Sequence, residues 1–226
     1  MTGKDHPTAK IVVSKDGPYL VSGGLPLVEQ IIVTNEEGES LEYRDGRTYP
    51  PAERYALCRC GHSGNKPFCD NTHKRVGFDG TETASHEAYD TQAKAIEGPA
   101  LVLTDVEALC AFARFCDPKG QIWNLVQQPD DPETRKIIEH EAGHCPSGRL
   151  VVWDRETNKP IEPEFAPSIG LIEDTAKQVR GPIWARGGIT VVSADGEPYE
   201  VRNRVTLCRC GRSNNKPFCD GSHAAP

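Results

Sequence analysis

Short apolar segments with strand character dominate the first part of the chain. Alternating or β-branched runs cover residues 9–13, 19–21 and 27–34, and turns that contain glycine separate them. Runs of this length, bounded by such turns, are typical of antiparallel strands. We therefore predict a small antiparallel β unit over residues 1–57.

The same pattern of strand and turn occurs a second time. Residues 17–25, GPYLVSGGL, match residues 181–189, GPIWARGGI. The first glycine of each copy lies 41 positions before Cys58 but only 27 positions before Cys208, so the first copy carries 14 extra residues. Surface loops absorb insertions at low cost. We expect the extra residues to form a loop around residues 35–52.

Between the two copies the apolar positions change to a helical period. Residues 104–107 form a capping-box pattern, and the spacing that follows predicts an amphipathic helix over 105–115. An acidic cap, a proline and a terminal glycine predict a second helix over 130–143. Residues 150–153 predict a strand, and the stretch 160–180, rich in proline and acidic residues, predicts a linker.

These patterns predict an α+β fold with three parts along the chain. A first β-rich module covers residues 1–80, a helical insert with its linker covers 81–180, and a second β-rich module covers 181–226. The unit that is repeated is a whole module, because the copies share their strands as well as their turns.

Composition narrows the class of protein. With 226 residues, 37% of them hydrophobic and 26% charged, the chain can bury a core, and its net charge of −7 argues against nucleic acid as a partner. No apolar run reaches the roughly 18–20 residues of a membrane span. Residues 1–7 lack an apolar signal segment, so we expect a cytoplasmic protein. In that reducing compartment, nine cysteines indicate metal binding rather than disulfides.

One pattern of cysteine and histidine occurs twice. Both copies read C-x-C-x8-C-x3-H, and the second lies 150 residues after the first, since 208 − 58 and 223 − 73 both equal 150. Cysteines scattered as small core residues would not keep this spacing. The predicted ligands are Cys58, Cys60, Cys69 and His73 in the first copy, and Cys208, Cys210, Cys219 and His223 in the second.

Thiolates and imidazole suit zinc, copper(I) and iron–sulfur clusters. Structural zinc ligands usually come in pairs separated by two to four residues. A C-x-C pair followed by a C-x3-H pair is better suited to two metal atoms, with one atom held by each pair. Spacing alone therefore favours a two-iron cluster over zinc and leaves both open.

The second copy resembles a known motif. Residues 216–223, KPFCDGSH, are similar to the defining motif of the CDGSH iron–sulfur domain (NEET) family, and the resemblance extends to residues 208–211 and Ser213. In the first copy it continues through residues 73–78. The tandem arrangement resembles the two-motif type found in bacteria. The family implies a redox-active [2Fe-2S] cluster bound by three cysteines and one histidine, and homodimers with one cluster per subunit.

The resemblance implies two [2Fe-2S] clusters, held by the eight ligands named above. Because one chain contains both modules, we expect them to pack as the two subunits of a family dimer do, in a monomer with internal pseudo-two-fold symmetry. We expect electron transfer with redox partner proteins, and no enzymatic activity because no catalytic fingerprint is visible. Cluster storage and transfer to apo-proteins, or a zinc-binding structural role, are alternatives.

The first copy departs from the motif at one place. It has Asn71-Thr72 where the second copy has Gly221-Ser222. Asparagine tolerates a left-handed backbone better than other non-glycine residues, so we expect both sites to be occupied but inequivalent. Asp70 and Asp220 are placed to cap the short helix that carries each histidine.

Three further cysteines, Cys110, Cys116 and Cys145, admit two interpretations. They suit buried small apolar residues. Alternatively, C-x5-C followed by CPSGRL resembles the divergent single-cluster ferredoxin segments that accompany CDGSH motifs, although a fourth cysteine is missing. Residues 140–144 spell HEAGH, the zinc-protease pattern, but Gly143 lies near the predicted helix end and disfavours that interpretation.

Overall fold

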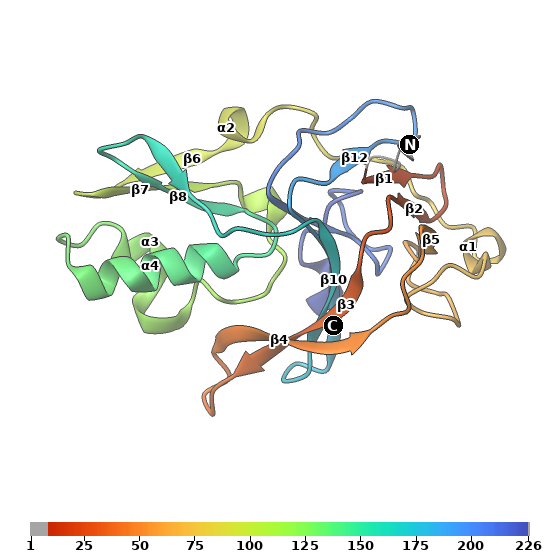
Figure 1. Ribbon diagram of the computed structural model, residues 1–226, viewed down its shortest axis with the longest axis horizontal. Coiled ribbons are helices and arrows are strands. Elements are labelled where there is room, and N and C mark those ends of the chain that lie inside the picture. Colours follow the sequence, from red (N-terminus) through yellow and green to blue (C-terminus); the bar gives the residue numbers. More distant parts are fainter. Residues whose placement is uncertain (1–8, 226) are drawn as a thin grey trace, which may run out of the picture.

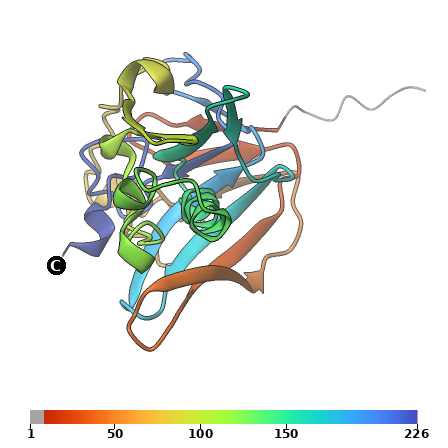
Figure 2. The same ribbon diagram turned by 90° about the vertical axis from the view of Figure 1, so that its left-hand side faces the viewer.

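The computed structural model describes residues 9–225 (Figures 1 and 2). The segment in which no signal was found, residues 1–7, lies outside the described residues. Within the described part, no helix is long and apolar enough to cross a membrane. The helices are α1 (Thr72–Arg75), α2 (Tyr89–Gln92), α3 (Ile122–Leu125) and α4 (Pro132–His144), with short 3₁₀ turns at Glu107–Leu109, Pro118–Gly120 and Ser222–Ala224. The strands are β1 (Lys10–Val13), β2 (Tyr19–Ser22), β3 (Leu27–Thr34), β4 (Ser40–Thr48), β5 (Arg54–Leu57), β6 (Lys94–Glu97), β7 (Leu101–Asp105), β8 (Leu150–Asp154), β9 (Lys159–Ile161), β10 (Ser168–Asp174), β11 (Val179–Arg186), β12 (Thr190–Val192) and β13 (Arg204–Leu207).

The strands form three sheets. Two sheets contain strands from both ends of the chain, in the orders β12-β1-β2-β5 and β13-β11-β10-β3-β4. The third, β6-β7-β8-β9, belongs to the middle of the chain and packs with α3 and α4 at one end of the molecule (Figure 1). The architecture is therefore a two-sheet body with a separate insert beside it.

Each of the two mixed sheets contains a strand that comes from the other half of the chain. β1 pairs in parallel with β12, and β10 pairs in parallel with β3; Ile11 lies opposite Val191, and Ile169 lies opposite Leu27. The antiparallel pairs β2·β5 and β11·β13 have equivalent registers. This reciprocal exchange is what a pseudo-two-fold axis between two similar modules produces. The predicted α+β fold with two modules packed as a pseudo-dimer is confirmed.

One hydrophobic core joins the two modules. Ile11 and Val21 of the first module pack in the same buried cluster as Ile169, Ile183 and Val205 of the second. β1 and β2 alternate buried with less buried positions, as half-buried strands do, whereas β13 is buried at every position. The exchanged strands therefore share the apolar face on which both modules depend.

The prediction of a loop around residues 35–52 is wrong. Residues 40–48 form β4, which pairs with β3 across a turn closed by Asn35 and Glu39. The strand is hard to recognise because most of its side chains are polar and exposed.

β4 serves as a surface on which the insert docks. The Ser40 hydroxyl donates to the carbonyl oxygen of Ala113 at 2.8 Å, and the Tyr43 hydroxyl donates to that of His144 at 3.3 Å. The Tyr43 ring also lies 4.7 Å from that of Phe115, centroid to centroid. The 14 extra residues of the first copy thus hold the insert in place.

The predicted helix over 105–115 is also wrong. That stretch begins at the end of β7 and continues into a single 3₁₀ turn. The Thr104 side chain does not cap a helix, because its hydroxyl oxygen accepts hydrogen bonds from Tyr89 at 3.0 Å and from the Trp153 indole at 2.9 Å. Contacts across the insert's sheet therefore override the local capping pattern.

Of the other three predictions for the middle of the chain, two are confirmed and one is wrong. The second helix is confirmed as α4, where the Asp131 carboxylate accepts a hydrogen bond from the backbone N–H of Thr134 at 2.9 Å. The strand over 150–153 is confirmed as β8. The linker prediction is wrong for residues 168–174, which form β10. The prolines of this stretch lie before β10, and the buried Ile169 and Leu171 of β10 complete the shared core.

Candidate metal centres

Both cysteine motifs are built on the same backbone frame. β5 and β13 end at Leu57 and Leu207, and each of these residues forms an isolated bridge with the phenylalanine that precedes the third cysteine, Phe68 or Phe218. These bridges fold each motif back on its own strand. The C-x-C cysteines are thereby brought beside the C-x3-H turn.

In each motif the predicted ligands lie in two close pairs. The Sγ atoms of the C-x-C cysteines are 3.8 Å apart in the first motif and 3.7 Å apart in the second, and the third cysteine's Sγ lies 3.4 Å from the histidine Nδ1 in both. Within residues 9–225, no group of three or more His, Cys, Asp or Glu side chains is arranged to hold a single ion. Each motif therefore presents its four ligands as two close pairs.

Asp70 and Asp220 anchor the turn that carries each histidine. The Asp70 carboxylate accepts hydrogen bonds from the N–H groups of Thr72 at 3.0 Å and Gly64 at 2.8 Å. Asp220 accepts equivalent bonds from Ser222 and Asn214. In Asp70, hydrogen bonds from Thr72 and Gly64 hold the pKa of the carboxyl well below its ordinary value. Both aspartates thus bond the first N–H of the turn, although the N-cap residues themselves are Asn71 and Gly221.

Backbone N–H groups point at two sulfur atoms of each site in a repeated pattern that sequence alone does not reveal. The residue two positions after the second and third cysteines of each motif donates to that cysteine's Sγ at 3.4 to 3.5 Å; the donors are His62, Asn71, Arg212 and Gly221. Donors placed on sulfur stabilise the thiolate form of a ligand. Each site therefore has two sulfurs prepared for metal binding in this way.

Arg59 and Arg209, which stand between the C-x-C cysteines, tie the motifs to the rest of the fold. Arg59 is 1% exposed and donates to the carbonyl oxygen of Gly80 at 2.6 Å. Arg209 donates to the carbonyl oxygens of Gly181 at 2.5 Å and Ile172 at 2.6 Å. Both arginine side chains therefore hold parts of the fold together instead of extending into solvent.

The two sites differ in what surrounds them. The backbone of Cys110 and the side chain of Phe112, both from the insert, pack against Gly221, where an added Cβ would lie 3.2 Å from the Cys110 carbonyl oxygen. Asn71, the equivalent residue of the first site, is exposed. Glycine is required at Gly221 by this close approach, and asparagine is accepted at Asn71 because the space beside it is open.

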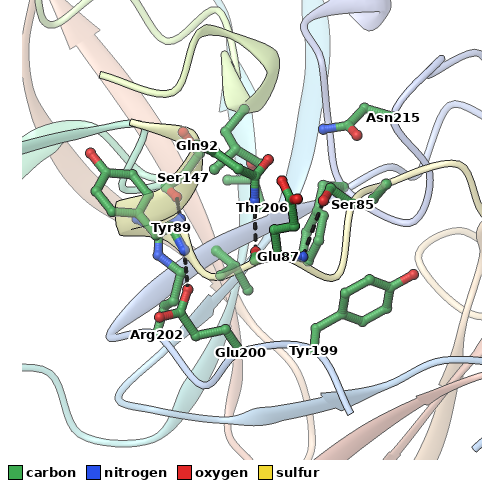
Figure 3. A pocket seen from close by; sticks show the side chains of 14 residues that line it. Ser85, Glu87, Tyr89, Gln92, Ser147, Tyr199, Glu200, Arg202, Thr206 and Asn215 are labelled. Carbon is green, nitrogen blue, oxygen red and sulfur yellow. Dashed lines mark hydrogen bonds between the residues drawn. The ribbon is translucent and has the colours of Figure 1, made fainter. Parts of the chain in front are cut away.

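A small pocket marks the seam between the insert and the second module. It has a volume of about 40 Å³ and is lined by Leu109 and Ser147 of the insert, by residues 84–92, and by residues of the second module that include Phe218 (Figure 3). At this seam the Tyr89 N–H donates to the Glu200 carboxylate at 2.7 Å, and the Arg202 guanidinium lies 4.1 Å from the centroid of the Tyr89 ring. The insert is thus fixed against the second site.

The three remaining cysteines gather at the edge of the insert. Cys116 and Cys145 pack against the insert's core, and Cys110 follows the 3₁₀ turn. Burial, then the nearby Asp117 carboxylate, then Cys145 and Cys110 raise the pKa of the Cys116 thiol. Cys110 lies outside any α-helix, and among residues 9–225 the three thiols are not arranged as a group that could hold one ion.

The HEAGH sequence does not form a protease-type zinc site. His140 Nε2 lies 2.8 Å from the Leu41 carbonyl oxygen, and His144 Nδ1 lies 2.8 Å from the His140 carbonyl oxygen. Both rings are therefore engaged with the backbone. Glu141 is buried, and neither of its carboxylate oxygens has a partner among the described residues.

Comparison with known families agrees with this geometry. The family described as "Iron-binding zinc finger CDGSH type" matches residues 16–74 and 180–224, and the family described as "Divergent 4Fe-4S mono-cluster" matches residues 96–155. A search of curated proteins finds no match. The chain is a tandem CDGSH iron-binding domain protein, as the resemblance indicated, and it binds iron–sulfur clusters.

Proposed function

We propose that each CDGSH site holds one [2Fe-2S] cluster and that the protein carries single electrons. The supporting observation is the spacing of the ligand pairs. A tetrahedral metal with metal–sulfur bonds of about 2.3 Å holds two thiolates roughly 3.8 Å apart, and a thiolate and an imidazole nitrogen roughly 3.5 Å apart. The two donors of each pair are as far apart as two ligands of one metal atom. A site with two such pairs is therefore suited to two irons.

The same spacing argues against the zinc-binding structural alternative. One tetrahedral zinc would gather all four donors around a single point, and no group of three or more such donors that could hold one ion occurs among residues 9–225. The ligand assignment follows from this division. Cys58 and Cys60 hold one iron and Cys69 and His73 the other, with Cys208, Cys210, Cys219 and His223 in the equivalent roles.

A bound cluster supplies one-electron chemistry, at a potential raised by imidazole in place of a thiolate. The chain positions the ligands and aims N–H groups at their sulfurs. Arg212 adds a charge at the second site that the first site, with His62 at the same position, does not have. A hydrogen bond with Cys208 and, after it, the N–H and guanidinium of Arg212 lower the pKa of the Cys210 thiol to about 6.

We also propose that Cys110, Cys116 and Cys145 hold a third iron–sulfur cluster. The match of this segment to a divergent 4Fe-4S family supports it. Loss of iron and sulfide from a Cys145→Ala variant, with both CDGSH sites retained, would be the direct test.

The expected partners are redox proteins, and the expected oligomeric state is a monomer, because both halves of the pseudo-dimer lie in one chain. The net charge of −7 disfavours nucleic acid. We place the protein in the cytoplasm, as a carrier rather than an enzyme. A second candidate function, delivery of clusters to apo-proteins, is favoured by one observation: Asp70 and Asn71, beside the first site's ligands, are exposed.

The test of the leading proposal is an anaerobic preparation examined by visible absorption. We expect a coloured protein whose absorption bleaches on reduction and returns on oxidation. A colourless protein containing zinc would contradict the proposal. Transfer of clusters to an apo-acceptor at a rate comparable with reduction would favour the delivery role instead.

A further inference from the structure

The two sites are copies, so equivalent positions can be compared for exposure. On the side of the third cysteine, the first site is the more open of the two. Asn65, Lys66, Asp70 and Asn71 are exposed and Cys69 is partly exposed, whereas Asn215, Lys216, Asp220 and Gly221 are partly buried and Cys219 is buried. The order is reversed at Cys60 and His73, which are more deeply buried than Cys210 and His223.

The insert causes this difference. The Asn215 side chain donates to the Ala108 carbonyl oxygen at 2.9 Å, and Gly221 packs against Cys110 and Phe112. Helix α1, which carries the first site's histidine, lies at the end of the molecule opposite α4 (Figure 1). The second site is therefore packed against the insert, and within residues 9–225 no equivalent contact of the insert covers Asn71 of the first site.

The open side of the first site is also the more basic. After His73, Lys74 and Arg75 are exposed and are followed by Val76, which is 48% exposed. The equivalent positions after His223 are Ala224 and Ala225. We call the surface formed by Lys66, Lys74, Arg75 and Val76 the first-site rim.

Carboxylates also lie near the rim. Asp70 accepts two backbone hydrogen bonds, Asp79 accepts bonds from the N–H and hydroxyl of Thr81, and Asp16 accepts one from the N–H of Gly80. These hydrogen bonds do not remove the negative charge. The rim segment from Lys74 to Val76 nevertheless presents two exposed cations and no carboxylate of its own, on a chain with a net charge of −7.

We propose that the first-site rim docks an acidic electron-carrier protein, which exchanges electrons with the first site. An exposed apolar side chain beside cationic ones suits a partner surface with carboxylates around a small apolar centre. Each exchange moves one electron between the partner and the first site, and no covalent bond is made or broken. The redox part rests on the proposed function, whereas the docking part rests on charge and exposure alone.

The test is a binding titration with a defined acidic probe. An oxidised plant-type [2Fe-2S] ferredoxin would be titrated into the purified protein by calorimetry, at about 20 mM and about 300 mM salt, which spans strong and weak screening. The rim variant is Lys74→Glu/Arg75→Glu. The matched control is Lys159→Glu/Lys177→Glu, which makes the same change of charge at exposed positions outside the two sites.

We expect the rim variant to raise Kd by about tenfold or more at low salt and the control by less than about threefold. The Kd of the unmodified protein should also rise with salt. An equal loss in both variants, an unaffected rim variant, or salt-independent binding would overturn the proposal. Urea unfolding of both variants verifies that each is folded. If the rim variant is not folded, the salt dependence of binding by the unmodified protein remains as a test.

Iron and sulfide measured on the same samples separate the two proposals. If the purified protein contains no iron–sulfur cluster but its docking still depends on the rim, only the proposed function is overturned. If the clusters are intact but the rim variant binds the probe as well as the unmodified protein does, only the rim proposal is overturned.

Discussion

Gly61 of the first motif lies so close to Cys210 of the second that an added Cβ would stand 2.5 Å from the Cys210 carbonyl oxygen. The relationship is reciprocal, since a Cβ on Gly211 would stand 2.6 Å from the carbonyl oxygen of Cys60. Both glycines have positive φ, 79° and 81°. The two motifs therefore touch at the pseudo-two-fold axis through positions where only glycine fits.

Replacing either glycine should damage both modules. We expect Gly61→Ala and Gly211→Ala each to lower the free energy of unfolding by roughly 2–4 kcal/mol, through backbone strain and overpacking. Gly38→Ala is the matched control, because Gly38 has a φ of 83° but nothing within 4 Å of an added Cβ. Urea unfolding compares the three variants, and equal losses at all three positions would show that the contact between motifs contributes nothing.

Arg204 connects the second module to the insert. Its guanidinium donates to the carbonyl oxygens of Ala142 at 2.6 Å and Cys145 at 2.7 Å, at the C-terminal end of α4, and pairs with Glu162 at 2.8 Å. Helix ends leave such carbonyls without partners, and cations are favourable there. Arg54, the equivalent residue of the first module, is exposed.

We expect Arg204→Leu to cost about 3–5 kcal/mol, because it leaves buried carbonyl groups and Glu162 without their partner. Arg54→Leu should change stability by less than about 0.5 kcal/mol. Thermal or urea unfolding measures both variants. A similar effect of the two substitutions would contradict the connecting role of Arg204.

The difference between Asn71 and Gly221 should be tolerated in one direction only. Asn71→Gly removes an exposed side chain and should leave both sites intact, with a stability change below about 1 kcal/mol. Gly221→Asn forces a Cβ to within 3.2 Å of the Cys110 carbonyl oxygen, so it should displace the insert and destabilise the second site by roughly 1–3 kcal/mol. Iron content measures the loss of the second site, and proteolysis of the insert measures its displacement. A Gly221→Asn protein that is unchanged in both measurements would contradict the close packing at Gly221.

Glu141 should make stability depend on pH. It is 2% exposed, and burial raises the pKa of its carboxyl from 4.5 to about 8. A raised carboxyl pKa means that the folded state binds the proton more tightly. Its contribution to stability is therefore full below about pH 4.5, falls as pH rises toward 8, and is constant above that.

We expect Glu141→Gln to reduce this fall, so that the variant exceeds the unmodified protein in stability above pH 8 by on the order of 1–3 kcal/mol. Glu133→Gln, at an exposed position of the same helix, is the control. Urea unfolding from pH 6 to 9 gives the comparison. Parallel curves for the unmodified protein and both variants would mean that Glu141 does not titrate in this range.

The sequence specifies most of the repeated frame and its ligands. Strands such as β3 were predictable because turns bound them, and the ligands were predictable because Cys58 to His73 and Cys208 to His223 keep one spacing. The exchange of strands between the modules was not predictable, because the pairing of Ile11 with Val191 joins residues far apart in the chain. A local pattern does not distinguish pairing within one module from pairing between two.

The errors have a common physical cause in the insert. The capping pattern at Thr104 is local, whereas the hydrogen bonds from Tyr89 and Trp153 that replace it come from other elements. β4 shows little alternation because its role is to contact the insert. The difference in exposure between Cys69 and Cys219 likewise depends on what packs beside each site rather than on the motif.

Counting iron and acid-labile sulfide per chain, anaerobically, distinguishes a two-iron cluster from a single metal at each site. The unmodified protein would be compared with variants that lose one ligand pair, Cys69→Ser/His73→Ala and Cys219→Ser/His223→Ala. We expect each variant to lose two irons and two sulfides, whatever the insert contributes to the total. Loss of one metal atom and no sulfide from either variant would contradict the assignment of two ligand pairs to two irons.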